Sequence, residues 1–130
     1  MIELTEAQVK RGCEDYLTYQ QNQGKLWWTR LNAGDIYIPN KDGSKRVFKG
    51  AGAGTADLMV IQGGNVQTYY KAISRGTPWP IAMVTFIECK STKGKQSTEQ
   101  VEFSIMIKGF NCRYAVVRSV DELQEILNGE

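Results

Sequence analysis

Two ionisable residues of opposite charge, Glu88 and Lys90, close an apolar run over residues 81–87. Side chains two positions apart in a β-strand project to the same face of the sheet. Burying such charges costs several kcal/mol unless something compensates them. Asp57 opens a second apolar run, residues 58–61, and offers a further carboxylate. A divalent cation bound together with a phosphate would compensate all three charges, so the pattern points to metal-dependent phosphate chemistry.

Each member of this set has a definite chemical capacity. The carboxylates of Asp57 and Glu88 can hold a divalent cation at oxygen sites, and such a cation lowers the pKa of a bound water. Lys90 can orient the attacking water or stabilise the negative charge of the transition state. The alternative is a surface hairpin with ordinary ion pairs, because the tripeptide Glu-x-Lys by itself is common.

A glutamine follows the Glu-x-Lys sequence at a suggestive spacing. Gln100 lies ten residues after Lys90, in the first turn of a helix predicted over residues 97–108. It falls at the edge of the stripe expected to be buried, where a half-buried amide can bond a water or a phosphate oxygen. The alternative is that Gln100 only caps the helix by reaching back to the Ser97 N–H. The predicted buried stripe consists of Phe103, Met106, Ile107 and Phe110.

An acidic residue also lies on the apolar face of the predicted first helix. Glu6 shares that face with Val9, Cys13 and Leu17. An inward-pointing acid is a candidate metal or water ligand. The alternative is that Glu6, in the first turn, only complements the helix dipole.

Basic residues gather in two polar segments. Such clusters suit a nucleic-acid backbone, and the resulting binding weakens with salt; the alternative is an ordinary solvated surface. The first cluster, within residues 40–50, consists of Lys41, Lys45, Arg46 and Lys49, and the second consists of Lys93 and Lys95 around Gly94.

The composition limits which metal sites and catalytic residues the chain can contain. The chain of 130 residues is predicted to form a single domain, residues 1–130. It contains no histidine, which excludes histidine-based zinc sites and Ser-His-Asp triads. A metal would therefore be hard and held by oxygen, which favours Mg²⁺ or Mn²⁺. The net charge of +2 permits an anionic partner.

The same composition bears on location. Three cysteines at wide spacings argue against a disulfide framework and for a reducing, cytoplasmic environment. No apolar stretch approaches the roughly 18–20 residues of a membrane span, and the first residues lack the features of a secretory signal. We therefore expect an intracellular protein without a membrane partner.

The order of elements defines a fold class. Capping boxes that begin at Thr5, Ser97 and Ser119 predict helices, and apolar runs between them predict strands. The order helix, strands, helix, strand, helix is typical of an α/β domain with helices packed on a mixed sheet. Residues 40–50 are expected to be flexible, and residues 65–80 form a long excursion between two neighbouring strands. Predicted helices cover residues 5–23, 97–108 and 119–129, and predicted strands cover residues 26–32, 36–38, 57–61, 81–90 and 113–118.

Taken together, these residues resemble a VRR-NUC domain of the PD-(D/E)XK nuclease superfamily. The specific part of the resemblance is residues 88–100, ECKSTKGKQSTEQ. The match covers most of the chain, with support from residues 5–8, 29–34, 54–58 and 114–119. The resemblance implies a restriction-endonuclease-like core, a central mixed β-sheet flanked by helices.

The resemblance also implies roles for the residues described above. Asp57 and Glu88 would be metal ligands, helped by the backbone carbonyl of Cys89. The other catalytic residues would be Lys90, the helix glutamine Gln100 and the first-helix acid Glu6. Glu6 could also be a metal ligand. Arg118 stands in the short motif behind the family name. We expect nucleic-acid contacts from Lys93, Lys95, Arg118, Lys45, Arg46 and Lys49.

The implied activity is hydrolysis of DNA phosphodiesters with Mg²⁺ or Mn²⁺, leaving a 5′-phosphate. Small stand-alone members resemble dimeric Holliday-junction resolvases and are often phage-encoded. This implies a homodimer acting on branched DNA in a bacterial or phage-infected cytoplasm. The alternatives are a non-catalytic DNA-binding module on the same fold and an RNA-processing nuclease. Two departures from the family pattern are Ala56 in place of a proline and the long excursion over residues 65–80.

Overall fold

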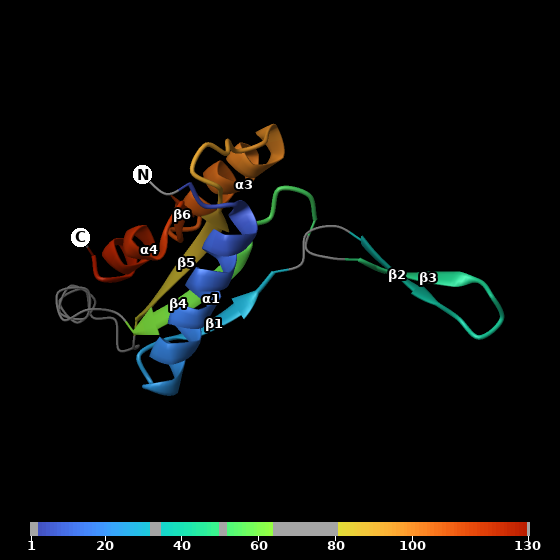
Figure 1. Cartoon of the computed structure of the whole chain (residues 1–130), viewed down its shortest axis with the longest axis horizontal. Helices are drawn as coiled ribbons and strands as arrows, with labels where there is room; N and C mark the ends of the chain where they lie inside the picture. The colour runs from blue at the N-terminus through green and yellow to red at the C-terminus, as the bar shows by residue number, and fades with distance from the viewer. Residues whose placement is uncertain (1–2, 32–34, 50–51, 64–80, 130) are drawn as a thin grey trace.

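The structure is a computed structural model that describes residues 3–31, 35–49, 52–63 and 81–129. The described part of the chain folds as a mixed sheet flanked by helices, so the predicted class is confirmed (Figure 1). The predicted excursion over residues 65–80 lies outside the described residues. The elements are α1 (Glu6–Asn22), β1 (Trp27–Arg30), β2 (Asp35–Pro39), β3 (Lys45–Lys49), β4 (Leu58–Gly63), β5 (Ala82–Cys89), α3 (Thr98–Lys108), β6 (Arg113–Val117) and α4 (Val120–Leu127).

The main sheet has four strands in the order β1-β4-β5-β6. The pairs β1–β4 and β4–β5 are antiparallel, and β5–β6 is parallel, so the sheet is mixed as expected. In the β4–β5 register, Leu58 lies opposite Ile87. The residues just beyond this pair, Asp57 and Glu88, therefore meet at one end of the sheet.

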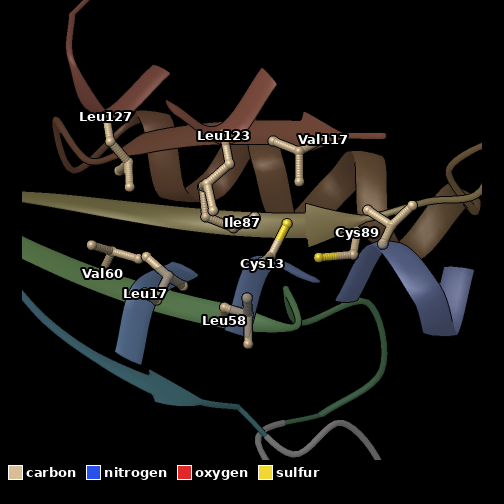
Figure 2. Packing of buried hydrophobic residues seen from close by; sticks show 10 residues of the cluster. Cys13, Leu17, Leu58, Val60, Ile87, Cys89, Val117, Leu123 and Leu127 are labelled. Carbon is tan, nitrogen blue, oxygen red and sulfur yellow. The ribbon is translucent and has the colours of Figure 1, made fainter. Parts of the chain in front are cut away.

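One face of the sheet packs against α1 and α4, where the buried core lies (Figure 2). The stripe predicted on the first helix is confirmed, because Val9, Cys13 and Leu17 are all buried. Side chains alternate along each strand, so the strand residues between the core positions face the opposite side. The core cluster consists of Val9, Cys13, Leu17, Leu58, Val60, Ile87, Cys89, Val117, Leu123 and Leu127.

The opposite face of the sheet is covered by α3. Phe103 makes edge contacts with Phe86 of β5 and Tyr114 of β6, at centroid distances of 5.5 and 6.1 Å. The predicted stripe was wrong at two positions, because Met106 and Phe110 are exposed. The helix ends at Lys108, so Phe110 lies in the following turn and no longer follows the helical period.

The three helices begin where capping chemistry predicts. Thr5 and Ser97 each form a complete capping box, with Gln8 and Gln100 respectively. Ser119 caps α4 by accepting a hydrogen bond from the Glu122 N–H. The Glu122 carboxylate, however, accepts from the Arg118 N–H at 2.6 Å, so this third box is not closed. Local sequence therefore sets all three helix starts.

Residues 40–50 contain a strand where a flexible segment was expected, and this prediction was wrong. β3 pairs antiparallel with β2 in a separate two-stranded sheet, with Tyr37 opposite Val47. The connecting turn is closed by the Asn40 N–H, which donates to the Ser44 carbonyl at 2.8 Å, and by the Ser44 N–H, which donates to the Asp42 carboxylate at 2.9 Å. The hairpin stands away from the main sheet (Figure 1).

Over the described ranges, no helix combines the length and apolar character that a bilayer crossing would require.

Candidate active site

Asp57 lies just before β4 and is held from both neighbouring strands. Its backbone carbonyl accepts a hydrogen bond from the Leu31 N–H, and its Oδ2 accepts one from the Cys89 N–H, both at 2.8 Å. The first bond fixes the main chain of Asp57 and the second orients its carboxylate. The antiparallel β4–β5 pair then sets this carboxylate beside Glu88.

Glu88 is a buried carboxylate whose two oxygens have different surroundings. The residue is only 2% exposed. Its Oε1 accepts a hydrogen bond from Gln100 Nε2 at 2.9 Å, whereas its Oε2 has no hydrogen-bond partner among the described residues. Burial, followed by the charge of Asp57, raises the pKa of Glu88 to about 8, although Lys90 acts in the opposite direction. At neutral pH and without a cation, the site therefore favours the protonated form of Glu88.

Lys90 lies beyond the end of β5, between two acids. Its Nζ is 3.6 Å from Glu6 Oε1 and 3.9 Å from Glu88 Oε1. Its backbone N–H donates to the Val117 carbonyl at 3.0 Å, which fixes the main chain at the strand end. Glu6 of α1 thus lies at the site as predicted, but its contact is with Lys90.

Gln100 caps α3, as one of the two alternatives predicted, and its amide also bonds Glu88, a partner that neither alternative named. Its Oε1 accepts a hydrogen bond from the Ser97 N–H at 2.8 Å, which completes the capping box. The other end of the same amide donates to Glu88. The same amide therefore caps α3 and orients the Glu88 carboxylate.

Lys10 is a member of the site that the sequence reasoning missed. Its Nζ lies 3.5 Å from Asp57 Oδ1. Lys10 is four residues after Glu6 in α1, and residues at this spacing share a helix face. That periodicity was the available signal. Lys10 is also more open to solvent than Lys90, with 36% of its side chain exposed against 12%.

Tyr114 is a second residue that was missed. It pairs with Phe86 in the β5–β6 register, so it shares the sheet face of Glu88. Its hydroxyl accepts a hydrogen bond from Gln96 Nε2 at 3.0 Å. Burial, with smaller contributions from the charges of Glu88 and Asp57, raises the pKa of Tyr114 to about 12. Tyr114 is therefore a neutral hydroxyl close to the acidic pair.

The predicted nucleic-acid contacts fall into two groups. Lys93 and Lys95 lie exposed in the loop after β5, and Lys93 Nζ pairs with Glu3 at 2.9 Å. Arg118 Nη1 donates to the Ser91 and Gly94 carbonyls, at 2.9 and 2.6 Å, so it holds the shape of that loop.

The second group lies on the β2–β3 hairpin. Lys45 and Arg46 are exposed on β3. Lys49 ends this strand, and its side chain lies outside the described residues. Over residues 37–47, no described hairpin side chain is bonded to Asp57 or Glu88, so this basic group lies apart from the carboxylate pair.

Cys89 can contribute to the site only through its backbone. Its side chain lies in the core next to Cys13 (Figure 2). A hydrogen bond with Cys13 and burial raise the pKa of the Cys89 thiol, which keeps it protonated. Within the ranges that the structure describes, no three His, Cys, Asp or Glu side chains gather in the manner of a metal site. Glu6 is therefore not grouped with Asp57 and Glu88 as a third ligand.

A shallow cavity of about 300 Å³ adjoins the site. It lies between the segment that leads to Asp57 and the first turns of α3. Its walls include two carboxylates, which disfavour an anion inside it. The lining residues are Ala53, Thr55, Glu99, Glu102, Phe103 and Met106.

No protein-family model, curated protein or solved structure matches the chain. The function is therefore inferred from the site itself.

Proposed function

We propose that this chain is a Mg²⁺- or Mn²⁺-dependent DNA endonuclease with a PD-(D/E)XK core of the VRR-NUC kind. The observation that supports this proposal most directly is the meeting of Asp57, Glu88 and Lys90 at one end of β4 and β5. Two carboxylates and an amine, donated by paired strands, form the minimum set for hydrolysing a phosphodiester with a hard cation.

The residues present fit a divalent cation. A buried carboxylate oxygen without a donor costs about 1–3 kcal/mol or more, and Glu88 Oε2 is such an atom. Asp57, Glu88 and the backbone carbonyl of Cys89 would hold the ion, with water as the remaining ligand type. When bound, the ion lowers the pKa of a water ligand and neutralises phosphate charge.

The neighbouring residues act by orientation and charge. Gln100 fixes Glu88 through one oxygen, and the other oxygen has no hydrogen-bond partner in the described part of the chain. Glu6 and Glu88 hold the Lys90 ammonium group, which is placed to orient a nucleophilic water or to stabilise negative charge on the phosphate. Lys10, more exposed and weakly paired with Asp57, is placed to contact a phosphate that approaches from solvent.

We propose branched DNA as the substrate and a homodimer as the active form. A domain of 130 residues covers little DNA alone. Paired cuts at a junction need two sites, which a two-fold symmetric dimer supplies. Mass measurement in solution, with and without a four-way junction, tests this part of the proposal.

The activity is tested by incubating the chain with four-way junctions, flaps, duplexes and single strands in Mg²⁺ or Mn²⁺. We expect Lys90→Ala and Glu88→Ala each to slow cleavage by about 100-fold or more. The matched controls are Lys108→Ala and Glu125→Ala, which remove the same side-chain types at exposed positions of α3 and α4. Thermal unfolding checks that each variant is folded.

The outcomes separate the candidate functions. Cleavage that persists unchanged in Lys90→Ala and Glu88→Ala rejects the endonuclease. DNA binding without any metal-stimulated cutting supports the non-catalytic binding module. Faster cleavage of RNA than of DNA, still dependent on Lys90, supports the RNA-processing nuclease.

A further inference from the structure

The β2–β3 hairpin is attached to the molecule at the site itself. On the incoming side, the Leu31 N–H donates to the Asp57 carbonyl. On the outgoing side, the chain returns through residues 52–56 directly into Asp57. The hairpin is thus an insertion whose two ends reach the same end of the main sheet as the carboxylate pair, and it points away from that sheet (Figure 1).

The described part of the hairpin is exposed and basic. Tyr37 and Val47, which face each other across the strands, are 64% and 45% exposed. The hairpin also carries the exposed Lys41, Lys45 and Arg46. The acid at its tip, Asp42, accepts hydrogen bonds from Ser44 N and Oγ, which commits this carboxylate to closing the turn.

Among the described residues, the hairpin has no strand partner outside itself. Within the described ranges, β2 and β3 form a two-stranded sheet of their own and are not paired with β1, β4, β5 or β6. A single two-stranded hairpin is at best marginally stable in water. An exposed ribbon with neighbouring basic and apolar side chains therefore suits a partner that supplies both negative charge and a groove.

We propose that β2 and β3 form an arm that lies in the major groove of a B-form DNA duplex next to the site. The major groove, about 12 Å wide, admits a two-stranded β-ribbon. Lys41, Lys45 and Arg46 contact phosphates along the groove, while Tyr37 and Val47 contact base edges and thymine methyl groups. This inference deepens the proposed function, because it assumes that the ligand is DNA.

Charge favours DNA over a second copy of this chain as the occupant. The arm is basic, and the whole chain carries a net charge of +2. Two copies of the arm laid against each other would repel, whereas a duplex presents a phosphate roughly every 1.7 Å of its axis. Pairing between two copies is nevertheless a distinct outcome of the test below.

The test measures binding of a short DNA duplex in EDTA, by fluorescence anisotropy over a series of salt concentrations. The variant Lys45→Gln with Arg46→Gln should bind about tenfold more weakly, and the slope of log K against log salt should fall by about two. The matched control, Lys25→Gln with Lys108→Gln, removes the same charge from exposed positions elsewhere. It should bind as the unaltered chain does.

A second variant tests whether the arm lies in the major groove. Residues 35–49 are replaced by a short Gly-Ser linker, and thermal unfolding confirms that the main sheet persists. The deep, narrow major groove of an A-form RNA duplex excludes a ribbon. Removing the arm should therefore weaken DNA duplex binding about tenfold and leave RNA duplex binding unchanged. Equal losses on both duplexes would overturn the major-groove placement.

Two further results would overturn the proposal that the arm binds DNA. One is an unaltered affinity and salt slope in the Lys45, Arg46 variant. The other is a chain that changes from dimer to monomer when the arm is removed, with DNA binding intact, which would assign the arm to a second copy. Because binding is measured in EDTA, DNA binding by the arm can be confirmed even if no metal supports cleavage. Metal-dependent cleavage can likewise be confirmed even if the arm does not bind DNA.

Discussion

Glu88 links the stability of this fold to its proposed chemistry through one side chain. One carboxylate oxygen is satisfied by Gln100, and the other has no partner within the described residues. A buried charge is destabilising until an opposite charge reaches it. Lys90 supplies part of that charge at 3.9 Å. A cation would supply the rest, so proton binding and metal binding should compete at Glu88.

The first prediction at this scale concerns pH. Because burial raises the pKa of Glu88 from 4.5 to about 8, the native state binds more protons than the unfolded state between these values. The contribution of Glu88 to the stability of the metal-free chain should therefore be greatest below about pH 4.5. It should fall as the pH rises towards 8. The loss is at most about 1.4 kcal/mol per pH unit.

Urea unfolding in EDTA across this pH range measures the effect. Glu88→Gln, which cannot titrate, should lack this downward slope. The hypothesis fails if the unaltered chain and the glutamine variant show the same pH dependence.

The second residue-scale prediction separates the two bonds of Gln100. Ser97→Ala removes the cap and should cost about 1 kcal/mol of stability. Gln100→Ala should cost a similar amount and also remove the donor to Glu88. Since a lost donor disfavours the charged carboxylate, only Gln100→Ala should raise the pH midpoint of the stability profile. Equal midpoints in the two variants would show that the Glu88 contact is unimportant.

At the scale of elements, the site is assembled where short segments pass very close to each other. The segment leading to Asp57 runs against the first turn of α3, the same turn that carries Gln100. Gly54 lies at this contact with a φ of 82°, and a Cβ there would fall 2.4 Å from the Glu99 carbonyl oxygen. Glycine therefore permits both the backbone conformation and the close approach.

A matched pair of glycine substitutions tests this packing. Gly43, in the hairpin turn, has a similar φ of 88° but open space around its Cα. Gly43→Ala should cost about 1–2 kcal/mol, the usual penalty of a left-handed conformation. Gly54→Ala should cost more and should also weaken metal binding, because it displaces Asp57 or α3. Chemical unfolding and calorimetry with Mn²⁺ measure the two effects, and equal costs would contradict the packing argument.

At the scale of the whole molecule, acids and bases from distant parts of the chain converge on one end of the sheet. Glu6 and Lys10 come from α1, Asp57 from the start of β4, and Glu88 with Lys90 from the end of β5. The burial of Glu88 close to Asp57 costs free energy, which packing of α1, α4 and the sheet must offset. A bound cation should therefore stabilise the entire fold.

The whole-molecule prediction is a metal-dependent thermal stability. A ligand that binds only the native state at about 100 times its Kd adds about 2.7 kcal/mol. Mg²⁺ or Mn²⁺ should thus raise the Tm of the unaltered chain and of Glu125→Gln, an exposed control. The same ions should leave Glu88→Gln unchanged. An equal shift in all three proteins would indicate non-specific screening and would contradict a metal site at Glu88.

The sequence predicted the parts of the fold that depend on local chemistry. Capping residues at Thr5, Ser97 and Ser119 gave the helix starts, and apolar runs gave the strands of the main sheet. β3 was not predicted because its basic residues are typical of a solvated loop. Its strand structure depends on pairing with β2, which the sequence of β3 alone does not show. Phe110 was placed in the core because a helical period was extended past the end of α3.

For the candidate site, the sequence alone determined which residues are chemically able to act: two acids that end or begin apolar runs, a lysine, and a glutamine at a helix start. Only the tertiary structure decided that they meet. The antiparallel β4–β5 register sets Asp57 beside Glu88, and the packing of α1 brings Glu6 and Lys10 to the same place. Contacts between residues so far apart in the chain leave no local periodic signal, because strand pairing and helix packing, not sequence spacing, set the distances between them.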